Sequence, residues 1–167
     1  MIEGDYKKAF FEAKIFLDVA ELIHNKSNTV DLENAKETFY GYRFAEYVNH
    51  SFAIELLFKT ILLKENGQHN TGHDLLDLFK ELSQNAKNKI TESIARLSRI
   101  NQEANDSTQL TPELLLSERN KPFTYFRYRY ETDNKLEPAY HLDPIADSLC
   151  NYLTSEYPEF NYVCMCF

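Results

Sequence analysis

The stretch that decides the fold is SFAIELLFKTILLKENG, residues 51–67. Its apolar residues recur at steps of three and four, the spacing of one face of an α-helix. Glu55 precedes Lys59 by four residues, the order in which an acid and a base best support a helix. Gly67 predicts the end of this helix, because glycine adopts the left-handed conformation common just past a helix C-terminus. Upstream the same pattern continues, so we expect a helical region over 34–64 that Gly41 could kink or divide.

Further helical patterns lie on both sides of this region. We expect one helix over 5–24 with Asp5 as N-cap, and another that follows Thr71 as N-cap. Asp74 then takes the place of the capping-box partner, although Glu or Gln is usual there. The apolar positions of these and the two following patterns are Tyr6, Phe10, Ala13, Leu17, Ala20, Leu75, Leu78, Phe79, Leu82, Ile90, Ile94, Leu97, Ile100, Ile145, Leu149 and Leu153.

Two proline positions predict the starts of the remaining helices. Thr111 and Pro112 have the order of a cap followed by proline in the first turn, and Asp143-Pro144 marks the start of the last helix. Only four glycines and five prolines occur in 167 residues, which disfavours a turn-rich β fold. The predicted fold is therefore all-α: an antiparallel up-and-down bundle of four to six helices. We expect a single domain over 1–167, with an aromatic tail at 157–167.

Composition limits the class of protein. Apolar residues make up 43% of the chain and charged residues 26%, as in ordinary globular proteins. Neither a membrane-spanning stretch nor a secretory signal is recognisable, so we expect a cytoplasmic protein without membrane contact. The three cysteines, Cys150, Cys164 and Cys166, lack the pattern of a disulfide framework or metal site. A net charge of −8 repels nucleic acid at long range, so binding it would require a local basic patch.

The segment FTYFRYRYE, residues 123–131, offers such a patch. Phe and Tyr alternate with arginine at a period of two, which suggests an extended segment. Aromatic rings could stack on bases while the cations contact phosphates. Alternatively, the rings form a wall of the core and the arginines pair with surplus carboxylates. The candidate nucleic-acid or anion-binding residues are Arg119, Lys121, Arg127, Tyr128, Arg129 and Tyr130.

Histidines provide few other signals. His69 and His73 lie four apart, but Gly72 separates them in an expected loop, and two histidines alone make a weak metal site. His73 and Asp74 could form an acid/base pair, although adjacent residues point to different sides of a helical turn. Polar side chains that satisfy the free N–H groups of the next helix are the simpler interpretation. We expect neither a metal nor a cofactor.

Three pieces of the chain together resemble the HEPN family of small helical bundles. They are SFAIELLFKTILLKENG with its Glu-x-x-x-Lys core, GHDLLDLFKEL, and the aromatic Arg-Tyr segment PFTYFRYRYE, and the resemblance covers 44–153. It implies a bundle of four to five helices that is often dimeric. Catalytic members are metal-independent ribonucleases with an Arg-x(4–6)-His motif. Their histidine acts in acid/base chemistry at the ribose 2′-hydroxyl, and their arginine stabilises the phosphate charge.

The chain departs from that catalytic pattern. No histidine stands at the required spacing after Arg119, Arg127 or Arg129. A formal match occurs earlier, because six residues separate Arg43 from His50. Seven residues make two helical turns, so these two side chains could share a face.

The resemblance to the family, together with the missing histidine of the catalytic motif, leaves three candidate functions. The first is a non-catalytic binding or regulatory module in a bacterial defence or toxin–antitoxin system, acting as a homodimer. Its partner could be a nucleotidyltransferase, a defence component, RNA or a nucleotide. The second is a divergent metal-independent ribonuclease, in which Arg127 or Arg129 holds phosphate and His50, His73 or Tyr130 transfers the proton. The third is a helical domain that binds a nucleotide or another small ligand.

Overall fold

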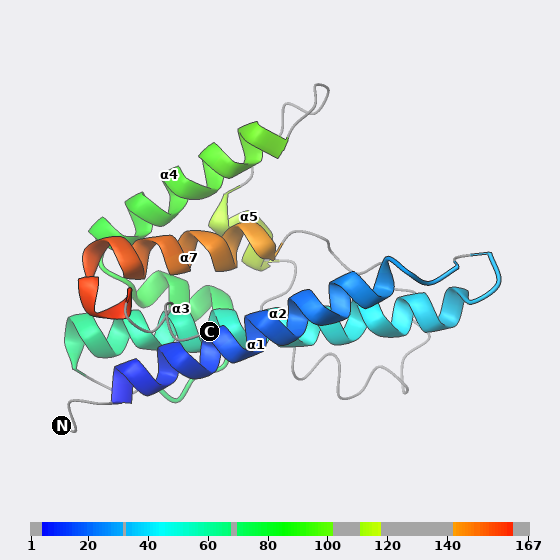
Figure 1. Ribbon diagram of the computed structural model, residues 1–167. Helices are drawn as coiled ribbons and strands as arrows, with labels where there is room; N and C mark the ends of the chain where they lie inside the picture. Colours follow the sequence, from blue (N-terminus) through cyan, green and yellow to red (C-terminus); the bar gives the residue numbers. More distant parts are fainter. Residues whose placement is uncertain (1–4, 32, 68–69, 102–110, 118–141, 162–167) are drawn as a thin grey trace.

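The structure of the chain is a computed structural model that describes residues 5–31, 33–67, 70–101, 111–117 and 142–161 (Figure 1). These parts contain six α-helices and no strand, so the all-α prediction is confirmed. The segment FTYFRYRYE lies outside the described residues, so its predicted conformation is not tested. The elements are α1 (Asp5–Ser27), α2 (Lys36–Asn66), α3 (Leu75–Glu81), α4 (Gln84–Asn101), α5 (Pro112–Ser117), α7 (Asp143–Glu156) and the 3-10 turn η2 (Pro158–Phe160).

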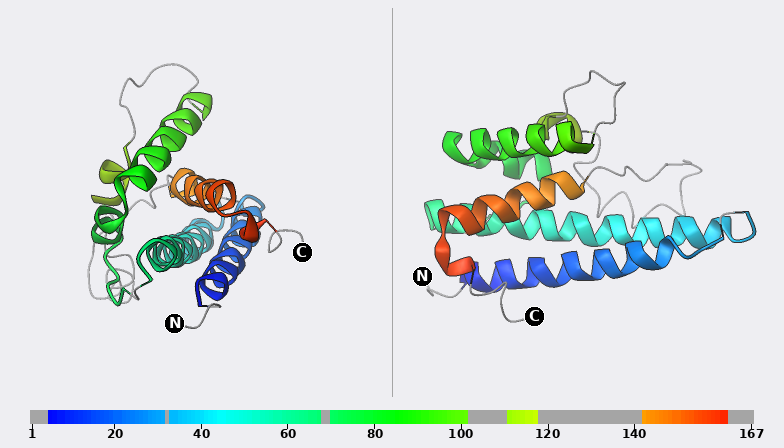
Figure 2. Two further views of the ribbon diagram at one scale, coloured as in Figure 1. Left: turned by 90° about the vertical axis from the view of Figure 1, so that its left-hand side faces the viewer. Right: turned by 45° about the horizontal axis from the view of Figure 1, so that its top comes forward.

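Helices α1 and α2 form a long antiparallel pair, and α3 and α7 pack on α2 (Figure 1). Helix α7 lies along α2 and runs in the same direction, while α4 contacts the other side of α7 and runs back (Figure 2). The short helices α3 and α5 fill the space beside α2 and α4. Side chains from all these elements and from η2 meet in one hydrophobic core, which includes Phe10, Ile54, Phe58, Ile61, Leu78, Phe79, Ile90, Ile94, Leu116, Ile145, Leu149 and Phe160.

Helix α2 is the centre of this arrangement. It passes through Gly41 without a break, since it is one helix of 31 residues. Its buried stripe includes Ile54, Leu57, Phe58 and Ile61, as the repeat of apolar residues predicts. Gly67 ends it with φ of 67°, and the Gly67 N–H donates to the Leu63 carbonyl. The predicted C-terminal glycine is therefore confirmed.

The N-cap predicted for the third helix is wrong. Thr71 stands outside α3, and Asp74 caps it instead. The Asp74 carboxylate accepts hydrogen bonds from the backbone N–H groups of Leu76 and Asp77. An aspartate directly before the first helical residue satisfies two free donors at once, so no capping box is needed. Thr111 does cap α5 as predicted, because its hydroxyl accepts from the Leu114 N–H at 3.2 Å.

The end of the described chain returns to α1. Phe160 of η2 is fully buried, and its ring lies 4.5 Å from that of Phe10 and 5.8 Å from that of Tyr6. Aromatic pairs at these centroid distances stabilise beyond the area they bury. Phe160 thus packs the first part of the aromatic tail on α1, and residues 162–167 lie outside the described part.

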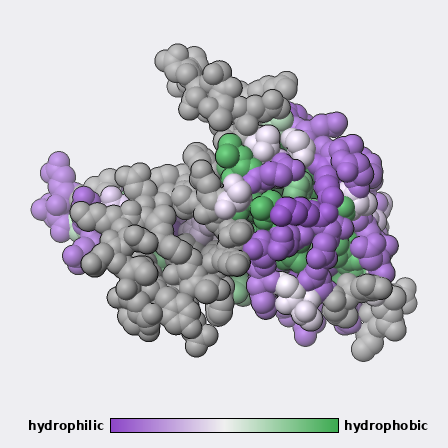
Figure 3. Space-filling view, turned by 180° about the vertical axis from the view of Figure 1, so that it is seen from behind, coloured by the Kyte–Doolittle hydropathy of each residue, from purple (hydrophilic) through white to green (hydrophobic). Residues whose placement is uncertain are grey.

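On the face seen from behind, the described residues are mostly hydrophilic, with smaller apolar areas between the polar ones (Figure 3). A stripe of four partly exposed apolar side chains runs along α1 at steps of three and four residues: Phe11, Ile15, Val19 and Leu22. Among the described helices, none combines the length and the hydropathy needed to cross a bilayer.

Candidate functional site

The candidate site lies on one face of α2. Arg43, Glu46 and His50 stand three and four residues apart, so a helix places them on the same side over two turns. Arg43 and Glu46 are almost fully buried, with exposed fractions of 9% and 5%. Buried charges are stable only when paired, and Arg43 Nη1 accordingly donates to Glu46 Oε2 at 2.7 Å. Glu46 therefore lies between Arg43 and His50 on this face of α2 and pairs with Arg43.

Helix α1 contributes His24 to the same group. His24 Nδ1 lies 3.0 Å from Glu46 Oε1 and 2.7 Å from Arg43 Nη1. One ring nitrogen cannot donate to the carboxylate and accept from the guanidinium at the same time, so these two contacts belong to different tautomers of His24. In either tautomer, His24 connects the C-terminal end of α1 to the first half of α2 through a hydrogen bond.

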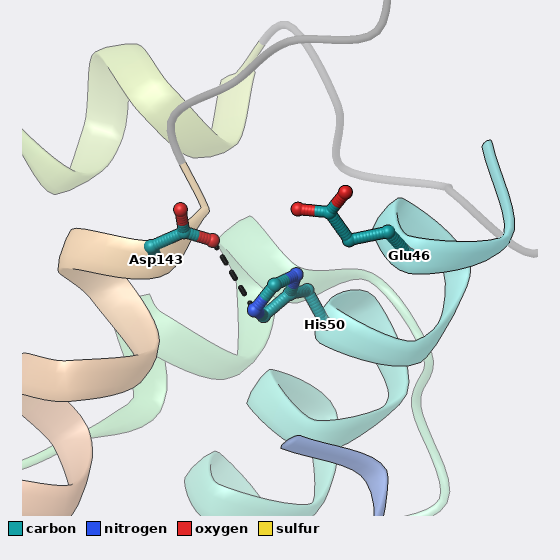
Figure 4. Close-up of side chains that lie close together, drawn as sticks. All are labelled: Glu46, His50 and Asp143. Atoms are coloured by element: carbon teal, nitrogen blue, oxygen red, sulfur yellow. Dashed lines mark ion pairs between the residues drawn. The ribbon is translucent and has the colours of Figure 1, made fainter. Parts of the chain in front are cut away.

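Helix α7 closes the group from the other side. His50 Nε2 lies 3.1 Å from Asp143 Oδ1, and the imidazole stands between the carboxylates of Asp143 and Glu46 (Figure 4). Asp143 is the first residue of α7, where the positive end of the helix dipole favours a carboxylate. His50 is 13% exposed at its side chain and Asp143 55%, so the pair opens to solvent on the Asp143 side.

A second carboxylate lies one turn further along α7. Partial desolvation and the nearby charge of Asp143 raise the pKa of Asp147, whose side chain is still exposed, above its ordinary value, while His50 and Lys14 act in the opposite direction. Negative charge is therefore concentrated beside His50. This concentration favours a bound cation at that point.

The arrangement offers two kinds of chemistry. A histidine held by a carboxylate has a fixed orientation, which is what a general acid or base requires. Alternatively, Glu46, His50 and Asp143 each offer one ligand atom to a divalent ion, and these three atoms lie within 4.8 Å of one another. A bound ion would have to compete with Arg43, which already holds Glu46. The expectation of no bound metal stays a prediction.

His73 belongs to a different cluster. Its Nδ1 lies 2.9 Å from Glu55 Oε1, which also accepts from Lys59 Nζ at 2.8 Å. Glu55 is five residues after His50, and five residues turn a helix by about 140° beyond one full turn. The structure therefore does not bring His73 to His50, and the adjacent Asp74 is occupied as a helix cap.

Of the predicted site residues, Arg43 and His50 meet at one site and His73 lies elsewhere. The remaining candidates lie outside the described residues: Arg119, Lys121, Arg127, Tyr128, Arg129 and Tyr130.

Four residues of the site were missed by the sequence interpretation: His24, Glu46, Asp143 and Asp147. Glu46 had a signal, because it stands between Arg43 and His50 at helical spacing. Asp143 was interpreted only as a helix start. No local pattern marks His24 or Asp147, since tertiary packing alone brings them to α2.

The fold and the site thus define an all-α protein with a buried arginine–glutamate pair and a carboxylate-bound histidine. In comparisons with known proteins, the chain matches no family model, no curated protein and no solved structure.

Proposed function

We propose that this chain is a HEPN-like binding or regulatory module that does not cleave RNA, of the kind found in bacterial defence and toxin–antitoxin systems. Its helical fold is consistent with that resemblance. So is the contact between two of the three resembling pieces, since Glu55 of the Glu-x-x-x-Lys core binds His73 of the GHDL turn. Analogy of fold does not assign function by itself, so the argument rests on the site.

One observation carries the non-catalytic assignment. In the described chain, Arg43 and His50 are the pair that fits the Arg-x(4–6)-His spacing, and the Arg43 guanidinium is buried against Glu46 and His24. A catalytic arginine must meet a phosphate, and this one already meets a carboxylate. Releasing it would leave the buried Glu46 carboxylate without its cation, a change that typically costs several kcal/mol.

The test is incubation of the purified chain with labelled RNA in the presence of EDTA. We expect no cleavage above the buffer control at high protein concentration. Arg43→Ala, His50→Ala and the distant His73→Ala should all be indistinguishable from the unmodified chain. Cleavage that disappears in His50→Ala and persists in His73→Ala would overturn the proposal.

One observation favours a second candidate, the metal-independent ribonuclease. Asp143 holds His50 by the same kind of contact that orients a catalytic base. In this candidate, His50 transfers the proton and Arg127 or Arg129 holds the phosphate. Activity would then fall in His50→Ala, Arg127→Ala and Arg129→Ala, and Asp143→Asn would shift its pH profile. His73→Ala, which alters a histidine–glutamate contact on another face of α2, is the matched control.

The expected homodimer also remains a proposal, as does a nucleotidyltransferase or defence component as partner. The apolar stripe on α1 supports the homodimer. Its exposed fractions run from 36% at Val19 to 69% at Leu22, and a two-fold axis can place one such stripe against its own copy. A stripe on a straight helix is self-complementary when the two copies run antiparallel.

A further inference from the structure

A polar cleft of about 440 Å³ lies between α4 and α7, separate from the site around His50. Helix α4 contributes Lys89, Ser93 and Arg96 to its wall, and α7 contributes Ser148, Asn151 and Tyr152. On each helix these residues stand at steps of three, four or seven, so each wall is one helical face. Two packed helices usually meet through apolar faces, so the composition of this contact needs another explanation.

Packing alone does not require these polar residues. The apolar contact of α4 with the core is made by Ala86, Ile90 and Ile94, which are fully buried. Leu149 and Leu153 make the corresponding contact from α7. The polar stripes run beside the apolar ones and line the cleft. Their residue types are therefore free to serve a ligand.

Two hydroxyl groups in the cleft lack hydrogen-bond partners. Ser148 is fully buried, and its Oγ has no partner in the described structure; the buried Oγ of Ser93 on the opposite wall has none either. A buried polar group without a partner loses its hydrogen bond to water and gains none in return. Other polar groups nearby are satisfied, since Tyr152 donates to Glu65 and Thr154 to the Cys150 carbonyl. An oxygen atom of a ligand could therefore accept the hydrogen bonds that these two serine hydroxyls do not make.

The charge of the cleft indicates the sign of that ligand. Helix α4 carries four basic residues and one acidic residue in a chain whose net charge is −8. Arg96 is exposed at the cleft and makes no hydrogen bond or ion pair with the described residues, whereas Lys89 pairs with Glu156. A guanidinium can bind two oxygens of a phosphate at once, and serine hydroxyls can donate to the others.

We propose that the α4–α7 cleft binds a small phosphorylated molecule, with its phosphate held by Arg96, Lys89, Ser93 and Ser148. The volume lies within the range of about 300–1,000 Å³ that is usual for small-molecule sites, so there is room for a sugar or nucleoside beside the phosphate. Bound phosphate would take the place of Glu156 beside Lys89. This inference goes beyond the proposed function, because it names a ligand whether or not the chain cleaves RNA.

Calorimetric titration of the full chain with AMP, with adenosine as the uncharged match, tests the proposal. We expect AMP to bind and adenosine to bind at least tenfold more weakly. Arg96→Gln should weaken AMP binding at least tenfold and Ser148→Ala about threefold. Lys87→Gln, which removes the same charge from α4 outside the cleft, should stay within twofold of the unmodified chain. Inorganic phosphate should compete with AMP.

Three results would overturn the proposal. The first is that neither AMP nor inorganic phosphate binds at millimolar concentration. The second is equal weakening by Lys87→Gln and Arg96→Gln, which would show general charge attraction instead of a site. The third is tight binding of single-stranded RNA that depends on Arg96 without binding of AMP, which would make the cleft part of a polynucleotide groove. Ser148→Ala also has a readout without ligand, because removing a buried hydroxyl that lacks a partner should stabilise the free protein.

Discussion

Glu55 of α2 and His73 of the segment before α3 meet through a contact of 2.9 Å between Oε1 and Nδ1. The same carboxylate oxygen accepts from Lys59 one turn further along α2. Glu55 is therefore the point at which the Glu-x-x-x-Lys helix and the GHDL turn are joined. Asp74, the next residue, then caps α3, so two adjacent polar residues fix the place and the start of one short helix.

The Glu55–His73 contact predicts that Glu55→Ala and His73→Ala lower the free energy of unfolding by different amounts. Glu55→Ala should destabilise the fold by about 1–3 kcal/mol, because a largely buried acceptor is lost and Lys59 loses its partner. His73→Ala should cost less than about 1 kcal/mol, since its side chain is 74% exposed. Urea denaturation of both variants measures the difference. A loss at His73→Ala as large as that at Glu55→Ala would contradict this order.

Much of the fold could be predicted from local pattern. The apolar stripe of α2 and the glycine at its end both correspond to the structure, because helix period and the left-handed conformation of Gly67 are local properties. The sequence alone did not show which residue caps α3. Thr71 and Asp74 are both good caps by composition, and only the Glu55–His73 contact shows where the preceding segment stops.

The candidate site was predictable only in part. Arg43 and His50 share a helical face, which their spacing shows without any structure. That Arg43 is occupied by Glu46 also follows from spacing, but its burial does not, since burial depends on α1 and on His24. Asp143 reaches His50 only because α7 begins beside the middle of α2. Contacts between distant segments carry most of the chemistry here.

The buried Arg43–Glu46 pair predicts strong non-additivity. Arg43→Ala and Glu46→Ala should each cost about 3–5 kcal/mol, because each leaves a buried charge without its partner. The double variant should cost clearly less than the two single costs together. Denaturant unfolding of all four proteins gives the coupling energy.

The exposed pair Lys8–Glu12 on α1 is the control for that cycle. It has the same kind of charges on one helix at 3.8 Å, and its coupling should be below about 1 kcal/mol. Additive costs at Arg43 and Glu46, similar to this control, would mean that the pair is solvated in solution.

The raised pKa of Asp147 predicts that its ionisation lowers the free energy of unfolding as pH rises. Partial desolvation of this exposed carboxylate and the charge of Asp143 raise its pKa in the folded chain above the ordinary value of 3.8. The folded state therefore binds this proton more tightly than the unfolded state, so ionised Asp147 weakens the fold at neutral pH. Asp147→Asn should be more stable than the unmodified chain at pH 7, and the difference should shrink as pH falls through the raised pKa and vanish below 3.8.

Urea denaturation at pH 7, 5 and 3.5 measures that difference, with Asp18→Asn on the exposed side of α1 as the control. The control should differ little from the unmodified chain at each pH. A loss of stability at pH 7 in Asp147→Asn would show that attraction to His50 and Lys14 outweighs burial, the reverse of the expected balance.

The apolar stripe of α1 predicts where a homodimer would form. Ile15 and Leu22 are 42% and 69% exposed, and burying them against a second copy would remove apolar surface from water. We expect light scattering to give twice the chain mass of 19.6 kDa at micromolar concentration. The double substitution Ile15→Glu and Leu22→Glu should give the monomer mass with an unchanged helical spectrum, because both side chains stand outside the core.

Leu114→Glu is the control, because Leu114 is a similarly exposed apolar side chain that lies on α5, away from the stripe. This variant should stay dimeric. A monomer for the unmodified chain would refute the dimer, and dissociation by Leu114→Glu alone would move the interface to α5.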